Sequence, residues 1–268
     1  MTAASGVQEN RNGGKIYPRI AAVVRLAGEE PRIGLALRSV AWTDEQIAVD
    51  LGSNGATIRE CGEHGVALVE AEELPAEIER RGADWLLFIE GHEEVSSALA
   101  QEIRGAMSIR GSGDAPVAYR IRRRVRFFGR TLRSRAWAAP HLVRVARRDA
   151  VSWNEAPLTI DSLPVRGYVG CLHAPLAAEP CASLRLYVSR MDIVTNAAAR
   201  AQHRLRAPAR SRDLIFGPVA HGLRVLPGAA ARDGMAGIIL AVLEAYSIMV
   251  TCAKRWEIEH IRGPRAPV

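Results

Sequence analysis

The sequence predicts an α/β protein with a doubly wound, mostly parallel sheet. Four strand-like segments alternate with helical segments, and this alternation indicates βαβ crossovers. The most informative segment is residues 84–89, DWLLFI, because such a continuous apolar run is typical of a strand buried on both faces of a parallel sheet. It is followed by EGHEE at residues 90–94, and polar residues after a central parallel strand lie where open α/β sheets bind ligands.

The other elements of the first half follow in chain order. Residues 1–17 are polar and rich in glycine and asparagine, so we expect a flexible tail there. Apolar segments predict three more strands, at residues 19–24, 46–50 and 66–70. Helices are expected between the strands, at residues 33–40, 57–64 and 75–81. We divide the chain into this tail, a core at residues 18–165 and a basic, helical extension at residues 166–268.

The middle of the chain is rich in arginine. Residues 119–148 contain eleven arginines, and those at the even positions from 120 to 126 alternate with mostly apolar residues. This alternation predicts a strand with one apolar and one cationic face. Because arginine binds phosphate in a bidentate manner, a diphosphate or a phosphorylated lipid could dock here. The alternative is a solvated basic face.

The C-terminal region contains two further segments of interest. Residues 167–187 contain several glycines and prolines and are predicted to be a loop. Residues 234–253 carry a single charge, Glu244, and are flanked by Arg232, Lys254 and Arg255. This segment is either a helix at the surface of an anionic membrane or a helix packed in the core.

The composition limits the class of partner. The 268 residues include 36 Lys and Arg against 29 Asp and Glu, a net charge of +7. This balance suits a phosphate-bearing ligand, an anionic membrane or nucleic acid. Nucleic acid is not expected, because aromatic residues are sparse among the arginines and no helix-turn-helix, RRM or zinc pattern occurs. The four cysteines lack CxxC spacing, so we expect a reduced, cytoplasmic protein.

Carboxylates follow several of the predicted strands. Glu29, Asp50 and Glu90 each lie at or just after the end of a strand, and we expect Asp50 and Glu90 to converge on one pocket at the carboxyl edge of the sheet. Glu90 and His92, separated by one glycine, could face one divalent cation or one sugar nucleotide. Asp50 alone fits a turn equally well, and the acidic loop alone fits a solvated loop before a helix N-cap.

Several motifs, in the same order, resemble the family 2 glycosyltransferases, and most closely the lipopolysaccharide-core β-1,4-glucosyltransferase branch. The resemblance covers roughly residues 19–258. It is carried by AGEE at 27–30, LRSV at 37–40, VDLGSNGAT at 49–57, DWLLFIEGHE at 84–93, FFGR at 127–130, RVARR at 144–148, LAVLEAY at 240–246 and AKRWE at 253–257.

The resemblance implies a GT-A-type core that binds a nucleotide sugar and transfers the sugar with inversion to a lipopolysaccharide or other cell-envelope glycolipid. From the apolar segment at residues 234–253 and its basic flanks, we expect peripheral attachment to the cytoplasmic face of the inner membrane. The predicted site residues fall into four groups: donor contacts Glu29, Asp50, Ser53 and Glu90; ligands of Mn²⁺ or Mg²⁺ at Glu90, His92 and His173; acceptor or phosphate contacts Arg130, Arg133 and Arg135; and candidates for the base at Glu93, Glu155 and Asp161, in that order.

The chain also departs from the family pattern. The family's DxD motif is replaced by Glu90-Gly91-His92, and Gly55 and Gly28 replace an Asp and an Asn of the family. Imidazole is a poorer ligand than carboxylate for Mg²⁺, although Mn²⁺ accepts it. These departures leave a second possibility, a catalytically degenerate protein of the same fold that acts as a binding or scaffold partner at the membrane.

Overall fold

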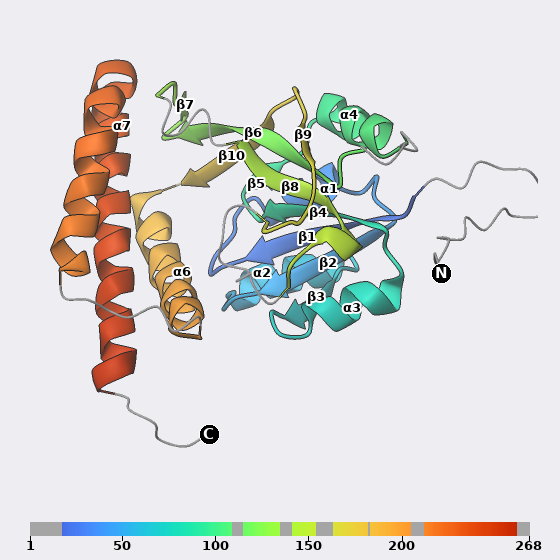
Figure 1. Cartoon of the computed structure of the whole chain (residues 1–268), viewed down its shortest axis with the longest axis horizontal. Helices are drawn as coiled ribbons and strands as arrows, with labels where there is room; N and C mark the ends of the chain where they lie inside the picture. The colour runs from blue at the N-terminus through green and yellow to red at the C-terminus, as the bar shows by residue number, and fades with distance from the viewer. Residues whose placement is uncertain are drawn as a thin grey trace, which may run out of the picture.

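The computed structural model describes residues 18–108, 115–134, 141–153, 163–181, 183–204 and 212–261. A central sheet is flanked by short helices, and two long C-terminal helices stand together beside it (Figure 1). The predicted α/β class with a mostly parallel central sheet is confirmed. Glu155, Asp161 and Arg135, three of the predicted site residues, lie outside the described residues.

The first half forms the predicted parallel sheet. Its strands are ordered β3-β2-β1-β4, and each neighbouring pair is parallel. The strands are β1 (Ile20–Leu26), β2 (Glu45–Asp50), β3 (Ala67–Glu70) and β4 (Trp85–Glu90). The connecting helices are α1 (Ile33–Ser39), α2 (Gly55–Glu63) and α3 (Leu74–Arg81). All seven elements were predicted from the apolar patterns, with boundaries shifted by one or two residues.

The sheet continues beyond β4 in the order β8-β6-β10-β5. β8 lies antiparallel to both β4 and β6, and β6 is the predicted arginine-rich strand. After β4 the chain forms β5 (Glu93–Glu94), α4 (Ser97–Ser108), β6 (Ala118–Phe127), β7 (Arg130–Thr131), β8 (His141–Arg147) and a short 3-10 helix, η1 (Arg148–Ala150).

The loop predicted at residues 167–187 is wrong. This segment contains β9 (Val169–Cys171) and β10 (Leu176–Cys181), and both pair in parallel with β6. Gly170 and Pro180, two of the residues that suggested a loop, are accommodated within these strands. A Cβ on Gly170 would lie 2.8 Å from the Tyr119 ring, so only glycine allows this close approach. Pro180 lies where the register between β10 and β6 shifts, a position where a strand tolerates proline.

Each face of the sheet has its own hydrophobic core. Alternate residues of β1 point to opposite faces, so that Ala22, Val24 and Leu26 pack in one cluster and Ala21 and Val23 in the other. β4 has the same alternation and is buried along its whole length. The predicted two-sided burial of this strand is therefore confirmed.

Two helices complete the described chain, α6 (Leu184–Arg204) and α7 (Asp213–His260). α7 is a helical hairpin, because Gly234 has φ 58° and ψ −140° and breaks the helix into two arms. The arms lie side by side (Figure 1), and His221 Nε2 of the first arm lies 3.0 Å from Glu244 Oε2 of the second. The hairpin turn is attached to the sheet because Asp233 accepts hydrogen bonds from the backbone N–H groups of Arg133 and Ser134.

The hairpin packs on the sheet through one face. Val225 and Ala229 of the first arm and Leu240 and Ala241 of the second join a cluster with Val125, Phe127, Leu132 and Ala178. α7 is the one helix among the described residues that is long and apolar enough to cross a membrane, yet only 17% of its most apolar window is buried. Within residues 234–253, Gly237, Leu240 and Ala241 are buried, Met235, Val242, Tyr246 and Met249 are exposed, and most of the others are half-buried.

Gly234→Ala should destabilise the protein by about 1–3 kcal/mol, because the backbone at Gly234 is in a region that L-residues avoid. The matched control is Gly228→Ala in the same hairpin, where an added Cβ meets no atom within 4 Å. That change should be neutral or stabilise the helix by up to about 1 kcal/mol. Urea unfolding of the three proteins measures both effects. Equal stabilities for the two variants would contradict the hairpin turn.

Candidate functional site

The candidate site lies at the carboxyl edge of the sheet, where β4 ends in Glu90-Gly91-His92. Gly91 lets the chain turn closely over its neighbours, because an added Cβ would lie 3.1 Å from the side chains of Glu30 and Leu26. The backbone N–H of Gly91 donates to the carbonyl of Arg25, so the turn after β4 is attached to β1. Glu90 and His92 are consequently held in the interior, and 6% and 9% of their surface is exposed.

Glu90 is paired with an arginine of the neighbouring strand. The parallel register sets Arg25 of β1 directly beside Glu90 of β4, and their side chains form an ion pair. Both residues are buried. A buried charge costs several kcal/mol unless it is paired, which explains why these two groups occur together in otherwise apolar strands.

Glu93 is held by a second buried pair. Its Oε1 accepts a hydrogen bond of 2.9 Å from Arg144 Nη2, and its Oε2 accepts one of 2.9 Å from the backbone N–H of Glu90. Arg144 lies within β8 and is 2% exposed. Arg123 of β6 approaches the same carboxylate at 3.8 Å. Glu93, predicted as a possible base, is thus engaged through both oxygens.

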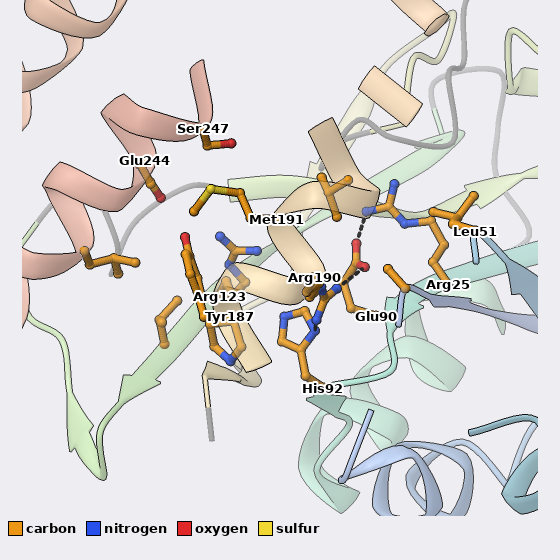
Figure 2. A pocket seen from close by; sticks show the side chains of 15 residues that line it. Arg25, Leu51, Glu90, His92, Arg123, Tyr187, Arg190, Met191, Glu244 and Ser247 are labelled. Atoms are coloured by element: carbon orange, nitrogen blue, oxygen red, sulfur yellow. Dashed lines mark hydrogen bonds and ion pairs between the residues drawn. The ribbon is translucent and has the colours of Figure 1, made fainter. Parts of the chain in front are cut away.

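A fourth arginine enters from α6. Arg190 Nη1 lies 3.0 Å from Glu30 Oε1, and its Nη2 lies 3.1 Å from Glu90 Oε2. The same guanidinium donates to His92 Nδ1. Figure 2 shows the side chains of Arg25, Glu90, His92 and Arg190 pointing toward one another. The helical extension thus contributes directly to the site of the sheet.

Burial and charge shift the titration of two of these groups. Burial, together with the nearby charges of Arg190, Arg123, Arg144 and Arg25, holds the pKa of His92 well below its usual value. Its ring is therefore neutral at physiological pH, and Nδ1 can accept the hydrogen bond from Arg190. Burial also raises the pKa of Glu30, although the charge of Arg190 opposes this.

A cavity of about 180 Å³ lies between this cluster and the C-terminal helices. Arg25, Glu90, His92 and Arg123 line it on the side of the sheet, whereas Tyr187, Arg190, Glu244 and Ser247 reach it from α6 and α7 (Figure 2). Its charged wall and its position at the carboxyl edge suit a small anionic ligand.

The predicted metal ligands do not fit a divalent cation in this arrangement. Glu90 and His92 already bind the Arg190 guanidinium. His173 lies between β9 and β10 with 94% of its side chain exposed, and its ring bonds Glu102 of α4. The structure therefore does not bring His173 to Glu90 and His92. In the part of the chain that the structure describes, no three His, Cys, Asp or Glu side chains are grouped to hold a metal ion.

The predicted convergence of Asp50 and Glu90 is wrong. The register places Asp50 beside Leu26 on one face of the sheet and Glu90 beside Arg25 on the other. Asp50 instead accepts hydrogen bonds from the backbone N–H groups of Gly52 and Ser53, which lower its pKa although partial burial opposes the shift. It thus has the turn-forming role that was the alternative from the sequence.

The other predicted contacts lie around the site rather than in it. Glu29 is exposed at the rim, and its neighbour Glu30 is the buried residue. Arg130 and Arg133 are exposed near the tip of β6 and β7, beside the turn of the α7 hairpin, and do not line the cavity.

Sequence reasoning missed Arg25, Glu30, Arg144 and Arg190. Arg25 and Arg144 each interrupt an apolar strand, IAAVVRL and HLVRVAR, and a charge inside a buried strand is a signal that a partner must exist. Arg190 gives no such signal, because it lies in a helix with many other arginines and polar residues.

No protein-family model matches the chain, and no curated protein does. Several solved structures are similar. A mannosyltransferase from Pyrobaculum calidifontis, in complex with GDP-Man and Mn²⁺, is 11% identical with a TM-score of 0.48, over 92% of this chain and 89% of that chain. Glucosyl-3-phosphoglycerate synthase from Mycobacterium tuberculosis, with Mn²⁺, UDP and glucosyl-3-phosphoglycerate, is 15% identical with a TM-score of 0.43, over 71% and 81%. Mannosyl-3-phosphoglycerate synthase from Rubrobacter xylanophilus is 14% identical with a TM-score of 0.39, over 72% and 77%.

These neighbours are nucleotide-sugar glycosyltransferases with the GT-A fold. Two of these three structures contain Mn²⁺. At such low identities and TM-scores, the likeness concerns the overall arrangement of the chain and does not identify a substrate.

His92→Gln should make the free energy of unfolding depend less steeply on pH in the acid range. The folded protein keeps His92 neutral, whereas the unfolded chain takes up a proton as the pH falls through about 6.5. The free energy of unfolding should therefore fall below that pH, by up to about 1.4 kcal/mol per pH unit from this group. Urea unfolding between about pH 5 and 7.5 tests this slope. His203→Gln, at an exposed histidine of α6, is the matched control. A His92→Gln slope as steep as that of the wild type would contradict the assignment.

Proposed function

We propose that this protein is an inverting glycosyltransferase that moves a sugar from a nucleotide-sugar donor to a lipopolysaccharide or other cell-envelope glycolipid. The observation that carries the proposal is the charged cavity at the carboxyl edge of the sheet, which has a helical hairpin with an exposed apolar face as its opposite wall. An anionic donor suits the arginines, and an acceptor embedded in a membrane suits the hairpin.

The reaction forms one bond and breaks one bond. The acceptor hydroxyl oxygen bonds to the anomeric carbon while the bond from that carbon to the phosphate oxygen breaks, and the nucleoside diphosphate leaves with the electron pair. Arginines around the cavity stabilise the charge that develops on this leaving group. Glu93, Glu155 and Asp161 are the candidates for the base that takes the acceptor proton. Of these, Glu93 would first have to give up its bonds to Arg144 and the Glu90 backbone.

The exposed face of the α7 hairpin supports a membrane partner. Ile215, Phe216, Val219 and Leu223 form one apolar stripe at helical spacing, and between 52% and 74% of each is exposed. Met235, Val242, Tyr246, Met249 and Trp256 form an exposed stripe on the second arm. Since the opposite face packs on β6 and β10, we propose that the hairpin lies on the cytoplasmic face of the inner membrane and does not cross it.

Charge favours a lipid surface over other occupants of this face. Arg224 and Arg232 are exposed on the first arm, and Arg130 and Arg133 lie near its turn. Basic side chains beside an apolar stripe bind anionic headgroups while the stripe enters the acyl boundary.

A transfer assay tests the enzymatic proposal. UDP-, GDP- and dTDP-sugars are incubated with the full chain and vesicles that contain an envelope lipid extract, and release of the nucleoside diphosphate is measured with and without vesicles. We expect release from one donor that depends on the vesicles. The matched pair of variants is Arg123→Ala, which lines the cavity, and the exposed Arg185→Ala, which does not. Arg123→Ala should slow release about tenfold or more, and Arg185→Ala should not.

A non-catalytic scaffold of the same fold is the second candidate. It is favoured by the pairing of Glu30, Glu90 and Glu93 with arginines, which leaves none of these carboxylates as an unengaged base. Binding of a nucleoside diphosphate without release from any donor sugar would support the scaffold over the enzyme.

Membrane attachment should depend on the apolar stripe of the hairpin. In flotation with vesicles that contain anionic lipid, Phe216→Glu combined with Leu223→Glu should release the protein, and raised salt should weaken binding of the wild type. Leu35→Glu combined with Ile58→Glu removes exposed apolar residues from α1 and α2 and should leave binding unchanged. If the wild type ignores such vesicles, the membrane proposal is wrong, and light scattering would then show whether a second copy covers the stripe.

A further inference from the structure

We infer that the Arg190 guanidinium takes the place of a divalent cation, so that this chain binds the diphosphate of its donor through Arg190 and Arg123 without a metal ion. This inference rests on the proposed function, because it concerns the donor of that reaction.

The contacts of Arg190 place a positive charge where a cation was predicted. Its guanidinium lies between Glu30, at 3.0 Å, and Glu90, at 3.1 Å, and donates to the ring of His92. Glu90 and His92 are the two residues of the altered DxD segment. A metal ion would have to displace Arg190 from both of them.

The charge of the cluster also disfavours a metal ion. Of the charged residues that line the cavity, three are arginines, Arg25, Arg123 and Arg190, and two are glutamates, Glu90 and Glu244. Behind them, the buried carboxylates of Glu30 and Glu93 are paired with Arg190 and Arg144. Along the cavity wall the arginines thus outnumber the carboxylates before any ion is added, and the neutral His92 contributes no charge. A site of this composition attracts a diphosphate and repels Mg²⁺ or Mn²⁺.

Both arginines line the cavity. Tyr187, Arg190, Met191 and Val194 lie on one face of α6 and line the cavity together. Arg123 lines it from β6, and 18% of its side chain is exposed, against 13% for Arg190. Guanidinium groups bind phosphate oxygens through such N–H groups, often two at a time.

Packing fixes α6, and therefore the backbone of Arg190, against the sheet. The Ile193 side chain lies close to Gly28 and Gly52, which belong to the loops after β1 and β2. On α7, Lys254 Nζ bonds Asp192 Oδ1 at 2.6 Å and Thr195 Oγ1 at 2.8 Å. The backbone from which the Arg190 side chain extends is thus held in place by the fold.

The experiment is calorimetric titration of the full chain with UDP, GDP and pyrophosphate, in EDTA and in Mn²⁺. For the wild type, we expect at least one of these probes to bind with the same affinity in both buffers. Arg190→Ala should weaken binding in EDTA by about tenfold or more, because charge-assisted hydrogen bonds are lost. Since that variant removes the guanidinium from Glu30, Glu90 Oε2 and His92 Nδ1, Mn²⁺ should restore part of its affinity.

Two controls separate this role from a structural one. Arg190→Gln keeps N–H donors for the buried carboxylates but removes the charge, and it should lose affinity in EDTA while remaining folded by thermal melting. Arg185→Ala removes an exposed charge from the same helix, away from the cavity, and should bind like the wild type.

Three outcomes would contradict the inference, and they differ in what they imply for the proposed function. Wild-type binding that requires Mn²⁺ would overturn the inference and leave the proposed function standing. Unchanged binding by Arg190→Gln in EDTA would also overturn it. Absence of binding for all three probes in both buffers would overturn the proposed function and the inference with it.

Discussion

The pairing of Glu90 with Arg25 across two parallel strands is the interaction on which the rest of the site depends. Both groups are buried, and either one alone would cost several kcal/mol. The Glu90 carboxylate also forms an ion pair with Arg190. The backbone N–H of Glu90 donates to the Glu93 carboxylate, which in turn binds Arg144. Removing Glu90 would take a shared carboxylate from both Arg25 and Arg190. This mutual dependence holds a polar loop in one conformation at the end of an apolar strand.

The C-terminal helices are part of the site because α6 contacts the charged cluster on one side and the α7 hairpin on the other. One face carries Arg190 into the charged cluster, while Asp192 and Thr195 bind Lys254 of the hairpin. Glu244 and Ser247 of the same hairpin line the cavity. The surface proposed to lie on the membrane is thus one helix away from the residues proposed to bind the donor. This proximity is what an enzyme needs when its acceptor stays in the lipid while its donor arrives from the cytoplasm.

The sequence predicted the first half of the fold well because strongly periodic apolar segments determine it. Residues 84–89 were predicted as a two-sided buried strand and are one. β9 and β10 were missed because they are short and because Gly170 and Pro180 suggested a loop. Their strand conformation depends on pairing with β6, which is distant in sequence. Of the charged cluster after β4, the sequence indicated Glu90, His92 and Glu93 but not the arginines that pair with them. Sequence order indicated Glu90 and His92, whereas Arg190 reaches them across a hundred residues of chain through tertiary packing that no local pattern records.

The departures from the DxD pattern have a consistent physical explanation in this arrangement. A glutamate reaches further than an aspartate, and Glu90 uses that length to contact arginines from both β1 and α6. A buried, neutral histidine is a poor ligand for Mg²⁺ but accepts a hydrogen bond from a guanidinium. Under the proposal that Arg190 takes the place of a cation, Glu90 and His92 are a pair suited to arginine rather than a weakened pair for a metal. The changed motif and the arginine of α6 then explain each other, so the altered residues are not by themselves an argument against the proposed glycosyltransferase activity.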